Sequence, residues 1–475
     1  MDSSALVRRS RTTELRLLIF ALLLVFAALE LVDLNQQPVA SWPAPQLALI
    51  FAVLCLAAHL TVRFVAPHAD PVFLPCVALL NGIGLTMIHR LDLAGALAAA
   101  QAGHSAPAQE APRQLLWMGI SIALFAGTMV LVRDHRRLAG YTYLAGALGL
   151  GFLILPGVLP ASLSEVNGAK LWVRLGPLSL QPGEFSKVLV IVFAAGFLVS
   201  KRHLFTTAGK RVFGMELPRT RDLGPLLLVW LASVCVVTFE KELGAALLFF
   251  GVALAMIYIA TERVSWVVVG LALFAIGCVA AFFLFNHIQQ RVTTWLDPLA
   301  TYDQPGGGYQ VSQSLFGLGT GGLTGTGLGA GRPDLVPFAS TDFISGALGE
   351  ELGMTGIAAI VVLYLLIATR GLRGALAVSD DFGKLLATGL SFSLALQVFV
   401  VVGGVTGLIP LAGMTLPFVS YGGSSLLANY LVLAVLLRVS NSIGETHTRP
   451  AQQATPLAES ATVLVNAPVT GRPPS

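Results

Sequence analysis

The chain has 475 residues, of which 55% are hydrophobic and only 11% are charged, with a formal net charge of +4 at pH 7. A soluble domain carries about 25% charged residues and shorter apolar runs, so this composition excludes a water-soluble protein. The small positive charge does not call for a nucleic-acid partner, because basic loops facing anionic lipid give the same balance. We therefore expect a membrane as the partner and no nucleic acid.

Apolar runs that are long enough to cross a bilayer as helices follow one another along the chain. They cover approximately residues 17–34, 46–66, 72–89, 114–132, 139–160, 184–200, 222–239, 243–261, 264–286, 352–369, 383–407 and 424–440. The sequence therefore predicts an all-α polytopic integral membrane protein with about 12 transmembrane helices.

Lysine and arginine residues gather on one side of this arrangement. If the N-terminus is cytoplasmic, the cytoplasmic segments include the basic start of the chain, the "RDHRR" loop at 133–137 and residues 201–221. The positive-inside rule then places both termini in the cytoplasm and a long loop near 287–351 outside the cell membrane. The Pro-, Thr- and Ala-rich residues 442–475 are predicted to be a disordered cytoplasmic tail.

The segments on the extracytoplasmic side carry most of the candidate chemistry. In "NGAKLWVRLGPLSLQPGEFSK", Lys170, Trp172 and Arg174 precede Glu184 and Lys187. The last two are spaced i, i+3 at the start of an apolar run, so both side chains project from one helix face. Ions at a membrane helix are costly, which makes them functional candidates, although a structural ion pair explains them equally well.

Further candidates follow in three short motifs. Glu242 lies in the break "FEKELG", Asp342 and Glu350 lie in "STDFISGALGEELG", and Ser424 begins the final span in "FVSYGGSS". A helix N-terminus with free amides and hydroxyls suits a pyrophosphate group, but it also suits an ordinary N-cap.

Asp303 stands in front of three glycines in "TYDQPGGGYQ". Glycines let the backbone adopt positive φ and approach a ligand closely, and a carboxylate held there could act as a general base. Asp297, which precedes a proline in "TTWLDPLA", is expected to start a turn. The four cysteines and eight histidines form no metal-binding motif, so no cofactor is evident and a divalent cation stays open.

Taken in order, these motifs resemble the SEDS family (shape, elongation, division and sporulation), the FtsW, RodA and SpoVE group, over about residues 70–441. The resemblance implies a peptidoglycan glycosyltransferase that polymerises lipid II outside the membrane beside a class B penicillin-binding protein transpeptidase. The family's essential aspartate matches Asp303, and its QPSE-x-x-K motif matches Gln181, Pro182, Glu184 and Lys187. Residues 1–70 would then be two additional spans before a core at 71–441, an enlargement that looks most like elongation-type members of actinobacteria.

The sequence departs from the family pattern at several positions. Gly183 replaces the motif's serine and Leu171 replaces an arginine, while Glu242 replaces the usual aspartate of Pro-Asp-Leu-Gly. Val401 stands where an asparagine is expected after "ALQVF", and Ser340 replaces a histidine. These changes put the roles of those positions in doubt but leave Asp303 in place.

The expected reaction is the attack of an acceptor sugar hydroxyl on a donor that carries a lipid pyrophosphate. Asp303 would take the proton, and Lys187, Arg174 and Lys170 would balance the charge that builds on the pyrophosphate. A single base predicts inversion. Two alternatives stay open at this point: a lipid II flippase, and a non-catalytic membrane scaffold for a transpeptidase.

Overall fold

The computed structural model describes residues 3–36, 42–166, 169–175, 178–201, 210–212, 215–217, 220–239, 242–304 and 307–448. Eleven helices in these ranges are long and apolar enough to cross a membrane. Every predicted apolar run coincides with a helix. The helices are α1 (Ser3–Asn35), α2 (Ala44–Val65), α3 (Phe73–Gln101), α4 (Glu110–Leu131), α5 (Thr142–Val158), α7 (Pro182–Ser200), α9 (Thr220–Phe239), α10 (Leu243–Thr261), α11 (Val264–Leu284), α14 (Ile344–Ala377), α15 (Asp381–Val405) and α16 (Gly423–Thr448). All twelve except α9 are among the eleven candidate spans, so the chain is a multi-pass helical membrane protein, as predicted.

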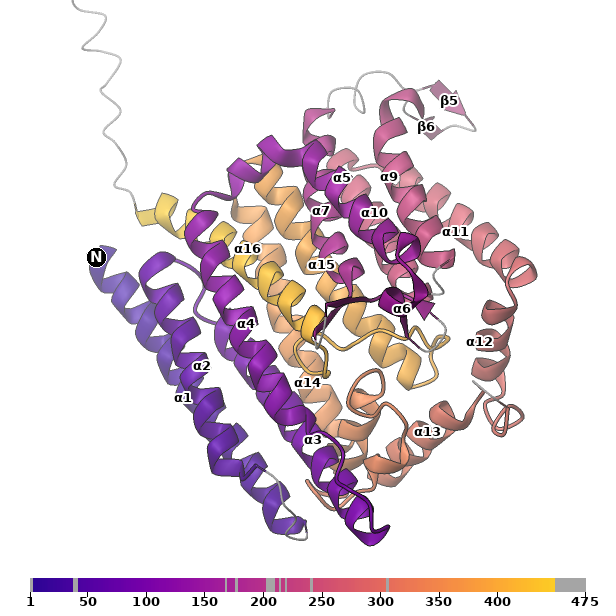
Figure 1. Cartoon of the computed structure of the whole chain (residues 1–475). Coiled ribbons are helices and arrows are strands. Elements are labelled where there is room, and N and C mark those ends of the chain that lie inside the picture. The colour runs from indigo at the N-terminus through magenta and orange to yellow at the C-terminus, as the bar shows by residue number, and fades with distance from the viewer. Residues whose placement is uncertain are drawn as a thin grey trace, which may run out of the picture.

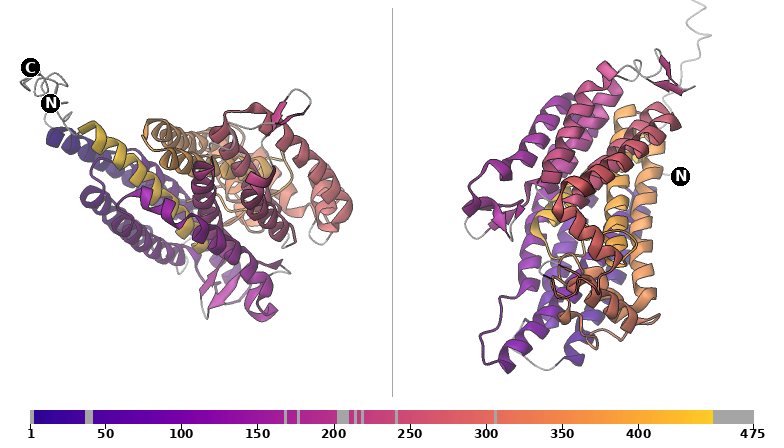
Figure 2. Two further views of the ribbon diagram at one scale, coloured as in Figure 1. Left: turned by 90° about the horizontal axis from the view of Figure 1, so that it is seen from above. Right: turned by 90° about the vertical axis from the view of Figure 1, so that its right-hand side faces the viewer.

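The first and last helices share one end of the bundle. The start of α1 and the last turns of α16 lie close together there (Figures 1 and 2). We call this the proximal end, and we call the opposite end, where α1 ends and α2 begins, the distal end. This arrangement agrees with an even number of spans.

The interior of the bundle is formed by α3, α15 and α16, most of whose side chains are buried, whereas α11 has no buried residue. Small residues allow helices and loops to approach closely. A Cβ on Gly84 of α3 would lie 2.1 Å from the Val419 carbonyl oxygen, and one on Gly196 of α7 would lie 1.9 Å from Thr142 Oγ1. No larger residue fits these two positions without a shift.

The segment predicted as a long loop at 287–351 contains short helices between the spans. It contains α12 (Asn286–Leu296), α13 (Tyr309–Gly321) and the short 3-10 helix η2 (Pro333–Leu335), and α14 begins inside it at Ile344. Gly353 has φ 68° and ψ −174°, so residues 344–352 form a separate short helix before the span proper. Amphipathic segments such as α12 fold here against the bundle, with Ile288 buried.

Short hairpins supply the only strands in the described ranges. Between α6 (Ala161–Ser164) and α7, β1 (Glu165–Val166) pairs with β2 (Ala169–Lys170), and β3 (Val173–Leu175) pairs with β4 (Leu178–Leu180). A third antiparallel hairpin, β5 (Lys210–Val212) with β6 (Met215–Leu217), lies at the proximal end near α9 (Figure 1). α16 continues to Thr448, past the predicted start of the tail at 442, and residues 449–475 lie outside the described ranges.

Candidate active site

The N-terminus of α7 brings two predicted site residues together. Pro182 occupies the first turn, where its missing N–H and fixed φ favour a helix start, and Glu184 follows in the same turn. Glu184 Oε2 and Lys187 Nζ form an i, i+3 ion pair at 2.6 Å. The Lys187 residue is only 6% exposed. The predicted pairing on one helix face is therefore present.

Lys187 also reaches across to α15. Its ammonium donates to Gln397 Oε1 at 2.9 Å, and Gln397 Nε2 donates to the Thr415 carbonyl oxygen at 2.9 Å. The ammonium is therefore held by an ion pair with the Glu184 carboxylate and by a hydrogen bond to the Gln397 amide oxygen.

Gln181, directly before α7, joins two further segments. Its backbone N–H donates to Ser424 Oγ at 2.8 Å, at the start of α16. Its side-chain amide donates to Glu242 Oε1, the residue before α10. Ser424 and Glu242 are thus brought to the start of α7.

Arg291 of α12 adds a half-buried guanidinium. Its Nη1 donates to the carbonyl oxygens of Leu411 at 3.0 Å and Ala412 at 3.2 Å. Burial lowers the pKa of Arg291, and the carboxylates of Asp342 and Glu242 oppose this shift. Burial raises the pKa of Asp342, and the Arg291 charge opposes that shift. Arg291 therefore interacts electrostatically with two carboxylates from different parts of the chain.

These contacts define what we call the central polar cluster. Its residues come from the distal ends of α7, α10 and α16 and from α12 and α15. Asp342, just before α14, completes the cluster. Its members are Gln181, Glu184, Lys187, Glu242, Arg291, Asp342, Gln397 and Ser424. The cluster combines two cations, three carboxylates and three neutral polar side chains.

Three predicted site residues lie apart from this cluster, on the two hairpins before α7. Lys170 is half-buried opposite Glu165 in β2, and Arg174 is exposed opposite Ser179 in β3. Trp172 is half-buried, and its backbone N–H donates to the Ser164 carbonyl oxygen at 3.3 Å. No hydrogen bond or ion pair in the described ranges joins their side chains to the cluster.

Asp303 lies on the turn between α12 and α13. It is exposed, and no described side chain or backbone group pairs with its carboxylate. The turn is closed by a hydrogen bond from Gly308 N–H to the Thr301 carbonyl oxygen at 2.9 Å. A Cβ on Gly308 would lie 1.8 Å from the Pro298 carbonyl oxygen, which explains a glycine there. Asp303 is therefore presented on a tightly folded turn, outside the central polar cluster.

Asp297 has the role that the sequence predicts. Its Oδ1 accepts a hydrogen bond from Ala300 N–H at 2.9 Å, so the side chain closes a turn after α12. Nearby, Gln313 of α13 donates to Tyr302 Oη at 2.8 Å, which ties the same turn to the next helix.

Glu350 lies in a different environment from the other predicted site residues. Its Oε1 accepts a hydrogen bond from Arg332 N–H at 2.7 Å, and its carbonyl oxygen accepts one from Thr326 N–H at 3.0 Å. The neighbouring Glu351 pairs with Arg90 of α3 at 3.0 Å. Glu350 thus holds the glycine-rich loop before η2, and no described hydrogen bond or ion pair links it to the central polar cluster.

Arg291 and Gln397 are cluster members that the sequence analysis missed. Each is a lone polar residue whose partners are far away in the chain, so spacing gives no sign of them. Their local sequence context does carry a signal. Gln397 interrupts an apolar run, and Arg291 is a basic residue of a short amphipathic segment. Polar residues in such positions are candidates by default.

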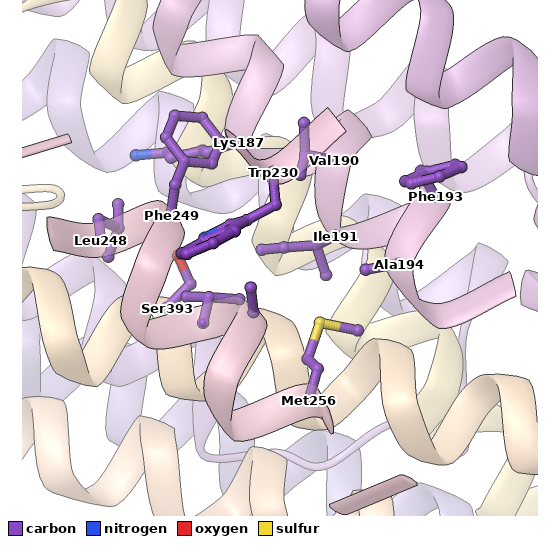
Figure 3. Close-up of a pocket in the computed structure, with 12 residues that line it drawn as sticks. Lys187, Val190, Ile191, Phe193, Ala194, Trp230, Leu248, Phe249, Met256 and Ser393 are labelled. Atoms are coloured by element: carbon purple, nitrogen blue, oxygen red, sulfur yellow. The ribbon is translucent and has the colours of Figure 1, made fainter. Parts of the chain in front are cut away.

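A small apolar cavity of about 20 Å³ lies beside Lys187 (Figure 3). Side chains from α7, α9, α10 and α15 line it, including Ile191, Trp230, Phe249, Met256 and Ser393. The cavity places hydrocarbon and aromatic surface directly next to the ion pair of the cluster. Within the described ranges, no group of three or more His, Cys, Asp and Glu side chains is placed to hold a metal ion.

A second group of charges lies at the proximal end, where Asp380 caps α15. Its Oδ2 accepts from Gly383 N–H at 2.6 Å, and its Oδ1 pairs with His135 Nε2 and with Arg136 Nε, each at 3.0 Å. Burial acts to raise the pKa of Asp380, but the Gly383 hydrogen bond, the His135 contacts and the Arg136 hydrogen bond outweigh it and lower the pKa. This group joins the 133–137 loop to α15.

The fold and the cluster together define a polytopic helical membrane protein with a polar site at the distal end of its bundle. The sequence profile of the cell cycle protein family FtsW/RodA/SpoVE matches residues 71–444. The chain belongs to this family. It is 53% identical to the protein named peptidoglycan glycosyltransferase RodA of Mycobacterium tuberculosis over 457 residues, which are 96% of each chain.

Other relatives and solved structures agree with this assignment. The chain is 34% identical to stage V sporulation protein E of Bacillus subtilis over 337 residues, covering 70% of this chain and 86% of the relative. It resembles a chain of a peptidoglycan synthase complex with a TM-score of 0.53 and 25% identity, covering 84% of this chain and 97% of the other. A variant of Thermus thermophilus rod shape determining protein RodA has the same fold, with a TM-score of 0.51 and 24% identity, covering 78% and 97%.

Proposed function

We propose that this chain is a peptidoglycan glycosyltransferase that polymerises lipid II into glycan strands. The observation that carries the proposal is the central polar cluster, in which a buried, ion-paired lysine lies beside apolar surface. A lipid-linked sugar pyrophosphate needs both features at once. The name of the mycobacterial relatives, which match the chain over nearly its whole length, supports the same activity.

The reaction would be a single displacement at the anomeric carbon of the donor sugar. Asp303 acts as general base and takes the proton of the attacking hydroxyl, while Lys187 and Arg291 balance the charge that develops on the leaving pyrophosphate. With one base and no nucleophilic carboxylate, the product has inverted configuration. Since Asp303 is exposed on its turn, the acceptor strand approaches from solvent and bridges the turn and the cluster.

The remaining predicted site residues take outer positions in this proposal. Arg174 and Lys170, on the hairpins before α7, attract the anionic donor by their positive charge. Trp172 provides a flat surface for contact with a sugar ring. The prenyl chain lies on the apolar surface beside Lys187, between helices. Glu350 is assigned to the loop that it holds and not to direct contact with substrate.

The proposal also includes orientation and partner. The basic segments that flank the proximal end, among them residues 133–137, support a cytoplasmic proximal end and an extracytoplasmic central polar cluster in a protein of the cell membrane. A class B penicillin-binding protein, the transpeptidase that crosslinks strands, is the proposed partner. The similarity to a chain of a peptidoglycan synthase complex supports this choice.

The test is an assay of purified full-length protein with fluorescent lipid II and no transpeptidase. We expect glycan strands to form, and we expect them to be lost when Lys187 is replaced by Met. A protein that transports lipid II across vesicles without making strands is a flippase. A protein that does neither but binds the transpeptidase is a scaffold. Either result would overturn the proposal.

A further inference from the structure

The distal end of α1 is hydrogen-bonded to a loop that lies almost three hundred residues further along the chain. Asn35 Nδ2 donates to the Leu328 carbonyl oxygen at 2.6 Å, and Gln36 Nε2 donates to the carbonyl oxygen of Gly329. We call residues 322–336 the tethered loop. Because α1 and α2 precede the region that matches the family profile, at 71–444, these contacts join an additional element to the core.

The contact is a close approach of backbone to helix. Gly329 has φ 79°, and a Cβ there would lie 3.0 Å from Asn35 Cβ and 3.4 Å from Val32 Cα. An L side chain at this position would be strained in backbone and would press on α1. The loop therefore rests directly on α1, with its carbonyl groups turned to the two amide side chains.

The end of α1 is itself held in place by Asp33. Its Oδ1 pairs with His89 Nε2 of α3 at 2.7 Å, and its Oδ2 accepts from Ala44 N–H at the start of α2 at 3.0 Å. One carboxylate thus joins α1, α2 and α3 within two residues of Asn35. The two amides project from a fixed support.

The opposite side of the tethered loop is held by buried ions. Glu351 Oε2 accepts from Gly329 N–H at 2.9 Å, and Arg90 Nη2 donates to the Gly331 carbonyl oxygen at 2.7 Å. Arg90 and Glu351 pair with each other at 3.0 Å, and both are almost fully buried. The loop is therefore clamped between α1 on one side and α3 with α14 on the other.

The tethered loop lies between two carboxylates, that of Asp303, the proposed base, and that of Asp342, a member of the central polar cluster. Before it comes α13, whose preceding turn carries Asp303, and after it the chain reaches Asp342 of the central polar cluster. Figure 1 shows this segment folded across the distal half of the bundle, beside the ends of α1 and α3. Fixing the loop limits the freedom of the short stretch that leads to Asp342 and of α13, whose preceding turn carries Asp303.

We propose that Asn35 and Gln36 are positioning residues, through which the additional N-terminal helices hold the segment that carries Asp303 and Asp342 in its reactive placement. The inference rests on the proposed glycosyltransferase function. It assigns a role in catalysis to helices outside the region that matches the family profile. A displacement of about 1 Å in a reacting group can lower a rate about 10²-fold, so two lost tethers are expected to reduce turnover measurably.

The test compares the Asn35→Ala/Gln36→Ala double variant of the full-length protein with Leu34→Ala, whose side chain is 77% exposed on the same turn of α1. We expect turnover of lipid II to fall by about tenfold to a hundredfold in the double variant, with KM unchanged. Amide hydrogen exchange is expected to become faster in residues 322–336 only. Leu34→Ala is expected to match the unsubstituted protein in both measurements.

The outcomes separate this inference from the function on which it rests. Unsubstituted protein that makes no strands contradicts the proposed function. Normal turnover in the double variant, with faster exchange in the tethered loop, shows that the tether does not position the reacting groups and overturns the inference. Faster exchange throughout the bundle also overturns it, because the two amides would then serve the whole fold.

Discussion

Replacing Lys187 by Met removes one partner of a buried ion pair while keeping most of the side-chain volume. The Glu184 side chain is 13% exposed, so its carboxylate would lose its cation with little access to water. Breaking a buried pair in this way typically costs about 3–5 kcal/mol, because the remaining charge is left without compensation. We therefore expect Lys187→Met to unfold at a clearly lower temperature than the unsubstituted protein.

The double variant Lys187→Met/Glu184→Gln separates stability from catalysis. It removes both charges, so most of the lost stability is expected to return. Strand formation is not expected to return, because removing one group that stabilises developing negative charge typically costs about 10²–10³-fold in rate. A structural ion pair predicts the opposite, namely recovery of both properties together.

Two measurements on purified protein decide this question: thermal unfolding in detergent, and strand length on a gel after incubation with fluorescent lipid II. Lys201→Met, at the other end of α7, is the matched control and is expected to leave both unchanged. Strand formation at the normal rate by the double variant would refute the role of the Lys187 ammonium in charge stabilisation.

Three further predictions concern orientation, the Asp303 turn and the proximal end. In a background without reactive native cysteines, Thr324→Cys is expected to react with an impermeant maleimide in intact cells, whereas Arg137→Cys is expected not to react. The reverse labelling pattern would place the central polar cluster in the cytoplasm. Gly308→Ala, which forces a Cβ onto a backbone carbonyl, is expected to lower strand formation about 10²-fold. Gly319→Ala, with nothing within 4 Å of the new Cβ, is the control and is expected to have no effect. Equal activity of the two variants would show that the shape of the turn is unimportant. Since the pKa of Asp380 is lowered on folding, its charge contributes stability that is complete above the unfolded value of 3.8 and is lost as pH falls through the lower folded value. Asp380→Ala is therefore expected to reduce the unfolding temperature at pH 7. The difference in unfolding temperature from the unsubstituted protein is expected to shrink as pH drops below about 3.8. A difference that stays constant with pH would contradict a stabilising role of the Asp380 charge.

The transmembrane helices were predictable because their signal is local. A span requires about 20 apolar residues whatever surrounds it, so each of the twelve runs coincides with a helix. The segment 287–351 was harder to predict, because α12 and α13 are short and fold against a bundle that the local sequence does not describe. Gly353 shows the same limit, since only its φ of 68° reveals that α14 has two parts.

The candidate site was predictable where spacing along one helix decides the geometry. Glu184 and Lys187 pair as an i, i+3 spacing requires. Arg291 and Gln397 could not be found in this way, because their partners come from distant segments and the contacts depend on how α12 and α15 pack. Conversely, Glu350 was a candidate site residue because it is an acid in one of the motifs. In the structure it accepts its hydrogen bonds from the tethered loop.

The most direct test of the proposed chemistry is strand formation by Asp303→Asn. Asn keeps the size and polarity of the side chain but cannot accept the acceptor's proton, and losing a general base typically costs about 10²–10⁴-fold in rate. Asp297→Asn is the matched control, because its amide oxygen can still accept the hydrogen bond from Ala300 N–H. We predict that Asp303→Asn reaches normal membrane levels and binds lipid II but forms no detectable strands, whereas Asp297→Asn stays close to normal. Normal strands from Asp303→Asn at unchanged protein levels would contradict the role of Asp303 as the base.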